Sequence, residues 1–532
     1  MPPQVAAERS PCVAEPAGSI RSDARHAKTR KRGAMMGDMA DTTPRATSNR
    51  STTPGSSVFK DHIASNWAER ERPLPAPREQ SAFAAARRAR LSELHTGRTI
   101  VVPAGQAKVR SNDCDYPFRP HSAFAHLTGW GTDTVVGSVL VLAPNGSGHD
   151  ATLYFRATAG RDSEEFYANP EIGEFWVGPR PSLAEVAADL GVATADLGEL
   201  DDALAGLDAS VLVVRDADPD FTRALDERLG TTVGGAAEQD GTPATDDVLS
   251  RDLSELRLVK DPYEVHELRK AVDATQYGFD DVIADFDAVL AHPRGERIVE
   301  GTFNRRARAD GNTVGYDTIA AAGHHACILH WTRNDGAVQP GDLILIDAGV
   351  EVDSFYTADI TRTLPVSGTF SPVQRMVYEA VLEAADAAFA IVEPGITFRQ
   401  VHATAMEVIA RKTAEWGFLP VSAEESLQPD NQFHRRYMVH GTSHHLGLDV
   451  HDCAKARREM YLDGIVQPGM VFTIEPGLYF QQDDLTVPEE FRGIGVRIED
   501  DILVTEDGAE NLSVGIPRTP SEVEGWIARS AR

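Results

Sequence analysis

The sequence predicts an α/β (α+β) protein of two domains, a small N-terminal α/β domain and a larger C-terminal domain with pseudo-two-fold symmetry. Three observations support this. Strand-like and helix-like segments alternate over residues 58–232. A long amphipathic stretch then leads to helical segments that alternate with pairs of strands over residues 286–517. Within this second part, residues 339–349 and 467–477 share one pattern at an offset of 128 residues.

Periodicity in the sequence predicts the helices, the strands and the domain boundaries. In the N-terminal domain we expect helices at 78–93 and 182–190 and strands at 99–103, 137–143, 151–155 and 210–214. In the second domain we expect helices at 296–310, 372–390 and 398–416. Pro262 interrupts the amphipathic stretch, so a break is expected near Asp261. The expected units are an N-terminal domain (58–247), connecting helices (248–285), a catalytic domain (286–520) and a polar C-terminal helix (521–532).

The first 55 residues differ from the rest of the chain. They are rich in Ser, Thr, Pro and basic residues and have few bulky apolar side chains, which predicts disorder. They contain no apolar segment of the kind found in secretory signals. The segment is either a basic tail for nucleic acid or a partner, or an over-extended start before Met35, Met36 or Met39. The second interpretation is the plainer one.

Composition limits the functional class. The net charge of −29 argues against nucleic acid or an anionic membrane as the main partner. No apolar run approaches the roughly 20 residues that a membrane span requires. The four cysteines are far apart and form no C-x-x-C pair, so reduced thiols are expected rather than disulfides or a thiolate metal site. These features predict a cytoplasmic enzyme or binding protein.

The repeat places one carboxylate at the end of an apolar strand in each copy. The copies read Gln-Pro-Gly-Asp-Leu-Ile-Leu-Ile-Asp-Ala-Gly and Gln-Pro-Gly-Met-Val-Phe-Thr-Ile-Glu-Pro-Gly, and they align Asp347 with Glu475. Each is a Pro-Gly turn, an apolar strand, a carboxylate and a glycine that ends the strand. A carboxylate in such surroundings is costly to bury without a partner. The pattern therefore indicates a buried cation.

A returning strand brings a second carboxylate in each copy. Pairing about a turn near Asp353 predicts that Asp359 lies directly opposite Asp347. In the second copy, Glu499 returns towards Glu475 across a longer loop. Four converging carboxylates repel one another, and two divalent cations would balance their charge. The alternative, four unrelated surface acids, does not account for the matched repeat.

Histidines cluster just before the second copy. His440, His444, His445 and His451 lie within a short segment of small residues and glycines. Imidazole is a common metal ligand, and outside the metal shell it can donate to an oxyanion. His330 ends an apolar run before the first carboxylate strand and is a second such donor. His445 is expected outside the metal shell or in the core, because its neighbour is the better ligand.

The chain resembles the proline-specific aminopeptidases of the creatinase/prolidase group, most of all the aminopeptidase P (Xaa-Pro aminopeptidase) family. The resemblance covers about residues 80–517. The matching stretches are 116–122, 127–129, 256–264, 346–349, 357–363, 440–444, 446–452, 473–479 and 492–501. It implies a pita-bread catalytic domain and a creatinase-type N-terminal domain that caps the active site. It also implies a homo-oligomer, a dimer or tetramer, in which the N-terminal domain takes part in subunit contacts.

The resemblance also implies a ligand set for two divalent ions, most often Mn²⁺. In this family pattern Asp347 and Asp359 bind one ion. Asp359 and Glu499 bridge to the second, which His444 and Glu475 complete.

The remaining site residues follow from the same resemblance. His330, His440 and His451 match histidines that bind the substrate and the transition state, and Arg497 matches a supporting arginine. Glu475 would carry a proton to the leaving prolyl nitrogen. The implied substrates are peptides with proline in second position.

Several alternatives stay open within and beyond the family. Prolidase, restricted to dipeptides, is the nearest, although residues 116–120 and 127–129 favour aminopeptidase P. Creatinase lacks metals, whereas all five ligands are present here, and methionine aminopeptidase lacks the N-terminal domain. A non-catalytic protein on the same scaffold would typically have lost ligands. The chain departs from the family at Ala125 and His126, where aromatic residues are frequent.

Overall fold

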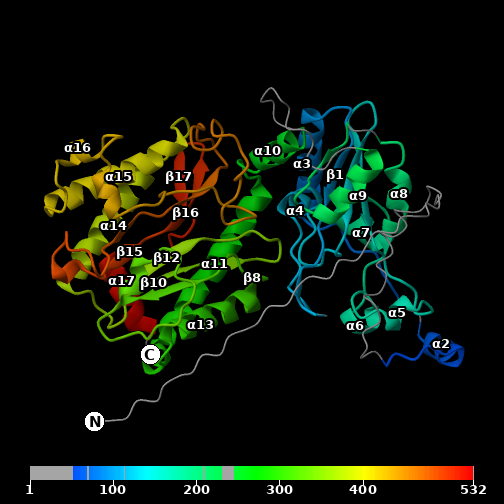
Figure 1. Ribbon diagram of the computed structural model, residues 1–532, viewed down its shortest axis with the longest axis horizontal. Coiled ribbons are helices and arrows are strands. Elements are labelled where there is room, and N and C mark those ends of the chain that lie inside the picture. Colours follow the sequence, from blue (N-terminus) through cyan, green and yellow to red (C-terminus); the bar gives the residue numbers. More distant parts are fainter. Residues whose placement is uncertain (1–51, 69–70, 113, 208–209, 231–244, 531–532) are drawn as a thin grey trace, which may run out of the picture.

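The computed structural model describes residues 52–68, 71–112, 114–207, 210–230 and 245–530. The chain forms two lobes joined by helices α10 (Thr245–Leu256) and α11 (Pro262–Ala284) (Figure 1). The predicted disorder of residues 1–55 falls almost entirely outside the described residues. No described helix combines the length and apolar character needed to span a membrane. The three described cysteines are free thiols, as predicted.

The N-terminal lobe is built on a five-stranded mixed sheet of order β6-β5-β4-β1-β7. Its strands are β1 (Ile100–Pro103), β4 (Val139–Pro144), β5 (His149–Phe155), β6 (Ala193–Asp196) and β7 (Leu212–Val213). Side chains of β1 alternate between two buried clusters, because successive residues of a strand face opposite sides. One face packs against α3 (Gln80–Leu94), α4 (Ser122–Thr128), α7 (Leu183–Leu190) and α10, and the other against α8 (Leu200–Ala203) and α9 (Pro219–Leu229).

The connection between the lobes breaks where the proline predicts. Helix α10 ends at Leu256. Helix α11 begins at Pro262, so the proline lies in the first turn of α11. The Asp261 carboxylate caps α11 by accepting hydrogen bonds from the Tyr263 and Glu264 amides. The break thus has both a steric cause and a stabilising cap.

The C-terminal lobe contains two three-stranded antiparallel sheets that share one core. The first has order β12-β10-β9 and the second β13-β16-β17. Their strands are β9 (Ile319–Ala322), β10 (Leu343–Ala348), β12 (Ile360–Pro365), β13 (Val471–Ile474), β16 (Asp500–Thr505) and β17 (Gly508–Asn511). Helices α11 and α13 (Gly295–Asp310) pack together beside the first sheet, and α14 (Pro372–Ala390) and α15 (Phe398–Glu415) beside the second. Each half is therefore a sheet with a helix pair, as the repeat predicts (Figure 1).

The predicted register of the first hairpin is wrong. Asp347 pairs with Thr361, two residues beyond Asp359. The turn is centred on Ser354 rather than one residue earlier, because Phe355 adopts a left-handed backbone with φ of 72° and closes a three-residue tip. A shift of two residues leaves Asp359 on the same face of the sheet as Asp347. The two carboxylates therefore still converge, on a diagonal.

The second hairpin has the predicted pairing. Ile474 pairs with Asp500, and Gly477 in β14 (Gly477–Tyr479) pairs with Arg497 in β15 (Gly495–Arg497). Both pairs have the same register, so Glu475 lies opposite Glu499.

The C-terminal helix α17 (Pro520–Ser530) is not polar on all sides, contrary to the prediction. Val523, Trp526 and Ile527 are buried in the core of the C-terminal lobe. The Trp526 indole also donates a hydrogen bond of 2.6 Å to Asp280 of α11. The apolar residues lie on one face at helical spacing, which makes the helix amphipathic.

Candidate metal centre

One cavity of about 660 Å³ in the C-terminal lobe brings all of the predicted site residues together. It lies between the two hairpins and the segment that carries the clustered histidines. The predicted residues that line it are His330, Asp347, Asp359, His440, His444, His451, Glu475, Arg497 and Glu499. Their positions agree with a single site, whereas their individual roles stay predictions.

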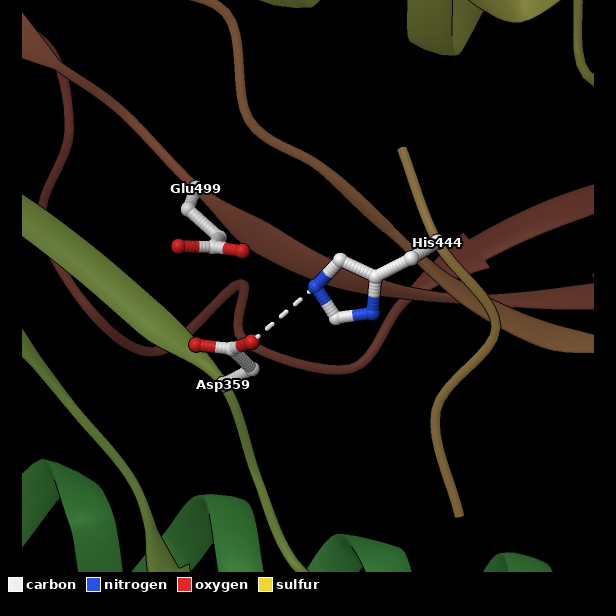
Figure 2. A group of neighbouring side chains, drawn as sticks. All are labelled: Asp359, His444 and Glu499. Carbon is white, nitrogen blue, oxygen red and sulfur yellow. Dashed lines mark ion pairs between the residues drawn. The ribbon is translucent and has the colours of Figure 1, made fainter. Parts of the chain in front are cut away.

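The tightest group is Asp359, His444 and Glu499 (Figure 2). One ligand atom from each lies within 4.8 Å of the other two. His444 Nε2 is 3.2 Å from an Asp359 oxygen and 3.7 Å from a Glu475 oxygen. Its Nδ1 faces the His445 carbonyl at 3.3 Å, which directs Nε2 towards the carboxylates.

Main-chain pairing holds these residues in place. The segment before His444 adds to the edge of β13, since the Thr473 amide donates to the His444 carbonyl and the Glu475 amide to the Thr442 carbonyl. The two hairpins meet where the Glu499 amide donates to the Thr361 carbonyl at 3.1 Å. The buried Thr361 hydroxyl donates back to the Glu499 carboxylate at 2.7 Å. The site is therefore fixed by the pseudo-symmetric contact of the two halves.

The carboxylates are electrostatically strained without a cation. Burial raises the pKa of Glu475 to about 7, although the charges of His444 and Arg497 oppose the shift. Burial and the neighbouring charges of Asp359 and Glu475 raise the pKa of Glu499 well above its usual range. Burial also raises the pKa of Asp359. Divalent cations would remove this penalty, so the donor set fits them.

The pKa of His444 is also raised, but the cause is the neighbouring carboxylates rather than burial. Burial alone would lower the pKa of His444, but the hydrogen bond to Asp359 and the charges of Glu475 and Asp359 raise it to about 9. Without a cation, the ring is therefore protonated near neutral pH and balances part of the negative charge. Oxygen and imidazole donors, with no cysteine among the lining residues, suit Mn²⁺ and similar ions.

Arg497 and His440 are linked through Tyr479. The buried Arg497 guanidinium pairs with Asp347, and it donates to the Thr361 hydroxyl at 3.1 Å and the Tyr479 hydroxyl at 3.2 Å. The Tyr479 hydroxyl in turn donates to His440 Nε2 at 2.7 Å, while His440 Nδ1 donates to the Gly441 carbonyl. Burial and the charge of Arg497 lower the pKa of His440 to about 3. His440 is therefore neutral near pH 7.

His445 and the two departures from the family pattern lie away from the cavity. His445 is fully buried and stacks on Phe398 with ring centroids 4.6 Å apart, so it belongs to the core. Ala125 and His126 are buried on α4. His126 faces Glu264 of α11 at 3.5 Å, so it contributes to the contact between the lobes.

Comparison with known proteins identifies the family. The model of metallopeptidase family M24 matches residues 266–506, and that of the aminopeptidase P N-terminal domain matches residues 84–213. Xaa-Pro aminopeptidase 2 of Streptomyces coelicolor is 51% identical over 470 residues, which cover 88% of this chain and 96% of the relative. The chain belongs to metallopeptidase family M24. The Xaa-Pro aminopeptidase of Escherichia coli is 32% identical over 85% of this chain and 98% of its own.

Solved structures agree with the M24 assignment. The aminopeptidase PepP of Pseudomonas aeruginosa has a TM-score of 0.71 and 32% identity, covering 85% of this chain and 98% of its own. A zinc-substituted E. coli aminopeptidase P in complex with product has a TM-score of 0.71 and 30% identity, covering 85% and 99%. The predicted resemblance is confirmed, and with it the fold class of a creatinase-type N-terminal domain followed by a pita-bread domain.

Sequence reasoning missed Tyr316, which lines the M24 cavity beside two predicted ligands. Its hydroxyl lies 2.7 Å from an Asp347 oxygen and 2.5 Å from an Asp359 oxygen. A phenol has one proton, so it can donate to only one of two ionised carboxylates. This is further evidence that the site requires positive charge. The only sequence signal was its place just before β9, which pairs with β10.

Sequence reasoning also missed Glu296, which holds the loop carrying His330. Glu296 is fully buried in the first turn of α13. Its carboxylate accepts hydrogen bonds from four donors on both sides of His330. These are the Ala322 amide at 2.9 Å, His325 Nδ1 at 2.7 Å, the Trp331 indole at 2.9 Å and the Gly336 amide at 2.6 Å. In the sequence, an acid at the start of a helix is typical of a solvent-exposed position.

Proposed function

We propose that the chain is a metal-dependent Xaa-Pro aminopeptidase, which hydrolyses the bond between an N-terminal residue and a following proline. The observation that carries this conclusion is the cavity, where the four predicted carboxylate ligands, four histidines and a buried arginine meet. The near full-length similarity to Xaa-Pro aminopeptidases supports the same reaction.

We infer that the five predicted ligands hold two divalent ions, which by the family pattern are Mn²⁺. Asp347 and Asp359 would hold the first ion, Asp359 and Glu499 would bridge, and His444 and Glu475 would complete the second. The raised pKa values of three of these carboxylates support a site with more than one positive charge. When bound, such ions activate water and polarise the scissile carbonyl.

The side chains around the ligands have separate tasks in this proposal. Glu475 lines the cavity opposite Glu499 and would take a proton from the attacking water and return it to the prolyl nitrogen. His330 and His451 line the cavity and would contact the substrate and its developing oxyanion. Arg497 and Tyr479 keep Asp347 and His440 in place through their hydrogen bonds.

The charges in the cavity favour an aminopeptidase over a prolidase. A dipeptide would place its C-terminal carboxylate inside the cavity, where it requires a cation. Among the described lining residues, the only lysine or arginine is Arg497, which is buried and already paired with Asp347. In a longer peptide the C-terminal carboxylate lies farther from the acidic residues of the cavity, so their negative charges repel it less.

A panel of three peptides tests the proposed specificity. The protein with Mn²⁺ should release arginine from Arg-Pro-Pro, leave Arg-Ala-Ala intact and cleave the dipeptide Ala-Pro poorly. Cleavage confined to Ala-Pro would instead establish a prolidase. The absence of any cleavage with metal bound would favour a non-catalytic protein on the same scaffold.

Substituting Ala for His330 should lower kcat for Arg-Pro-Pro by about 10²-fold or more, as expected for loss of an oxyanion donor. The metal content should not change, because His330 is not among the predicted ligands. Steady-state kinetics and elemental analysis of the purified variant check both statements. The exposed neighbour Arg333, replaced by Ala, is the control and should keep normal activity. Loss of metal from the His330 variant would contradict the assigned role.

The affinity for Mn²⁺ should rise with pH from about 6 to about 8.5. Without metal, Glu475 has a pKa of about 7 and His444 of about 9, so both carry protons at the lower end of this range. These protons must leave before the groups can bind a cation, and each one released changes the dissociation constant by about tenfold per pH unit. Calorimetric titration in two buffers of different ionisation enthalpy measures the protons released. A dissociation constant independent of pH would refute this prediction.

A further inference from the structure

His451 has few contacts of its own to fix its ring. The residue is exposed, and neither ring nitrogen forms a hydrogen bond with another described residue. Among the aromatic rings of the described residues, its ring packs against that of His444, with centroids 4.4 Å apart and the planes perpendicular. It also lines two cavities, the 660 Å³ site and a second of about 210 Å³ between the lobes. Its position therefore depends on how the loop on either side is held.

Cations from outside the catalytic domain hold this loop on both sides of His451. After it, the buried Asp452 accepts a hydrogen bond of 2.8 Å from Arg257, which follows α10. Before it, Arg119 of the N-terminal lobe donates to the Leu448 carbonyl at 2.6 Å. Arg119 also lies 3.3 Å from the Asp449 carboxylate.

The same arginine reaches the first hairpin. Arg119 Nε donates to the buried Glu351 carboxylate at 2.7 Å, and the guanidinium lies over the Phe355 ring, 5.2 Å from its centroid. This hairpin carries Asp347 and Asp359. One side chain of the N-terminal lobe thus joins the His451 loop to the hairpin of the predicted metal ligands.

We propose that Arg119 is a positioning residue through which the N-terminal lobe places His451 for the reaction. The inference rests on the proposed function, because it assumes that His451 contacts the substrate. A guanidinium can bond to Glu351, the Leu448 carbonyl and Asp449 at once, since its donors lie in a planar fork. A lysine ammonium is a compact charge and cannot span all three. The N-terminal lobe therefore acts on turnover through this arginine.

The test compares Arg119→Lys and Arg119→Ala with Arg457→Ala as a matched control. Arg457 forms an exposed ion pair with Glu255 of α10, only a few residues beyond the same loop. Both Arg119 variants should lose about 10²-fold in kcat for Arg-Pro-Pro, as expected for a small displacement of a catalytic group, with little change in metal content. The control should keep its activity. Full activity of Arg119→Lys would overturn the proposal.

A double mutant separates positioning from a general structural effect. In a His451→Ala background, Arg119→Ala should cost little further activity, because it acts through the missing side chain. Independent, multiplicative losses would overturn the proposal.

Hydrogen–deuterium exchange over residues 446–453 gives a readout that does not depend on activity. Exchange should rise in both Arg119 variants and not in Arg457→Ala, and unchanged exchange would refute the positioning role. If the unmodified protein cleaves no peptide, the proposed function fails, whereas the exchange result still shows whether Arg119 holds the loop.

Discussion

Substituting Gln for Glu475 is expected to lower kcat for Arg-Pro-Pro by about 10³-fold or more. The amide preserves the size of the side chain opposite Glu499, but it can neither carry a proton nor supply a negative charge. Glu475 lies opposite Glu499 in the cavity, where a carboxylate can take a proton from water and pass it to the leaving nitrogen. Pre-steady-state kinetics with excess enzyme would show whether the chemical step is the one affected.

The control for this substitution is Glu506→Gln. Glu506 is an exposed residue that follows β16 in the same half of the domain, so its loss should leave kcat unchanged. A Glu475→Gln variant within tenfold of the normal rate would contradict the assignment of proton transfer to this residue.

Asp359→Ala should abolish turnover together with metal binding. Asp359 contacts both parts of the site, since it shares the Tyr316 hydroxyl with Asp347 on one side and faces His444 Nε2 at 3.2 Å on the other. A ligand shared by two ions contributes to the affinity of each, so its loss should leave less than about one ion per chain. Elemental analysis after gel filtration measures the ions retained.

Asp353→Ala is the matched control, because Asp353 is exposed at the tip of the same hairpin. It should bind metal and turn over peptide normally. An Asp359→Ala variant that retains two ions would refute the bridging role.

The sequence was sufficient to predict the repeat, the convergence of the carboxylates and the location of the histidines. Pro-Gly turns, apolar strands and terminal acids are local patterns, and alternation along a strand determines which face a side chain occupies. The exact partner of Asp347 was predicted wrongly because the tip depends on the left-handed backbone of Phe355. Nothing in a bulky aromatic residue signals that conformation. The face of the sheet predicted for Asp359 was still correct, because the register was wrong by two residues and residues two apart on a strand point to the same side.

Residues that support the site indirectly could not be predicted. Glu296 accepts hydrogen bonds from residues 26 to 40 positions further along the chain, and such partners are decided by packing rather than local pattern. Tyr316 and Arg119 are similar cases, because their partners lie on distant segments. The C-terminal helix was predicted to be polar, although the spacing of Val523, Trp526 and Ile527 was the signal for its buried face.

The central claim is that turnover of an Xaa-Pro peptide depends on divalent ions in this cavity. The most direct test is the release of arginine from Arg-Pro-Pro by protein dialysed against a chelator, followed as Mn²⁺ is added and the bound ions are counted. We predict no release without metal and full release once about two ions per chain are bound. Undiminished cleavage by the metal-free protein would contradict the account.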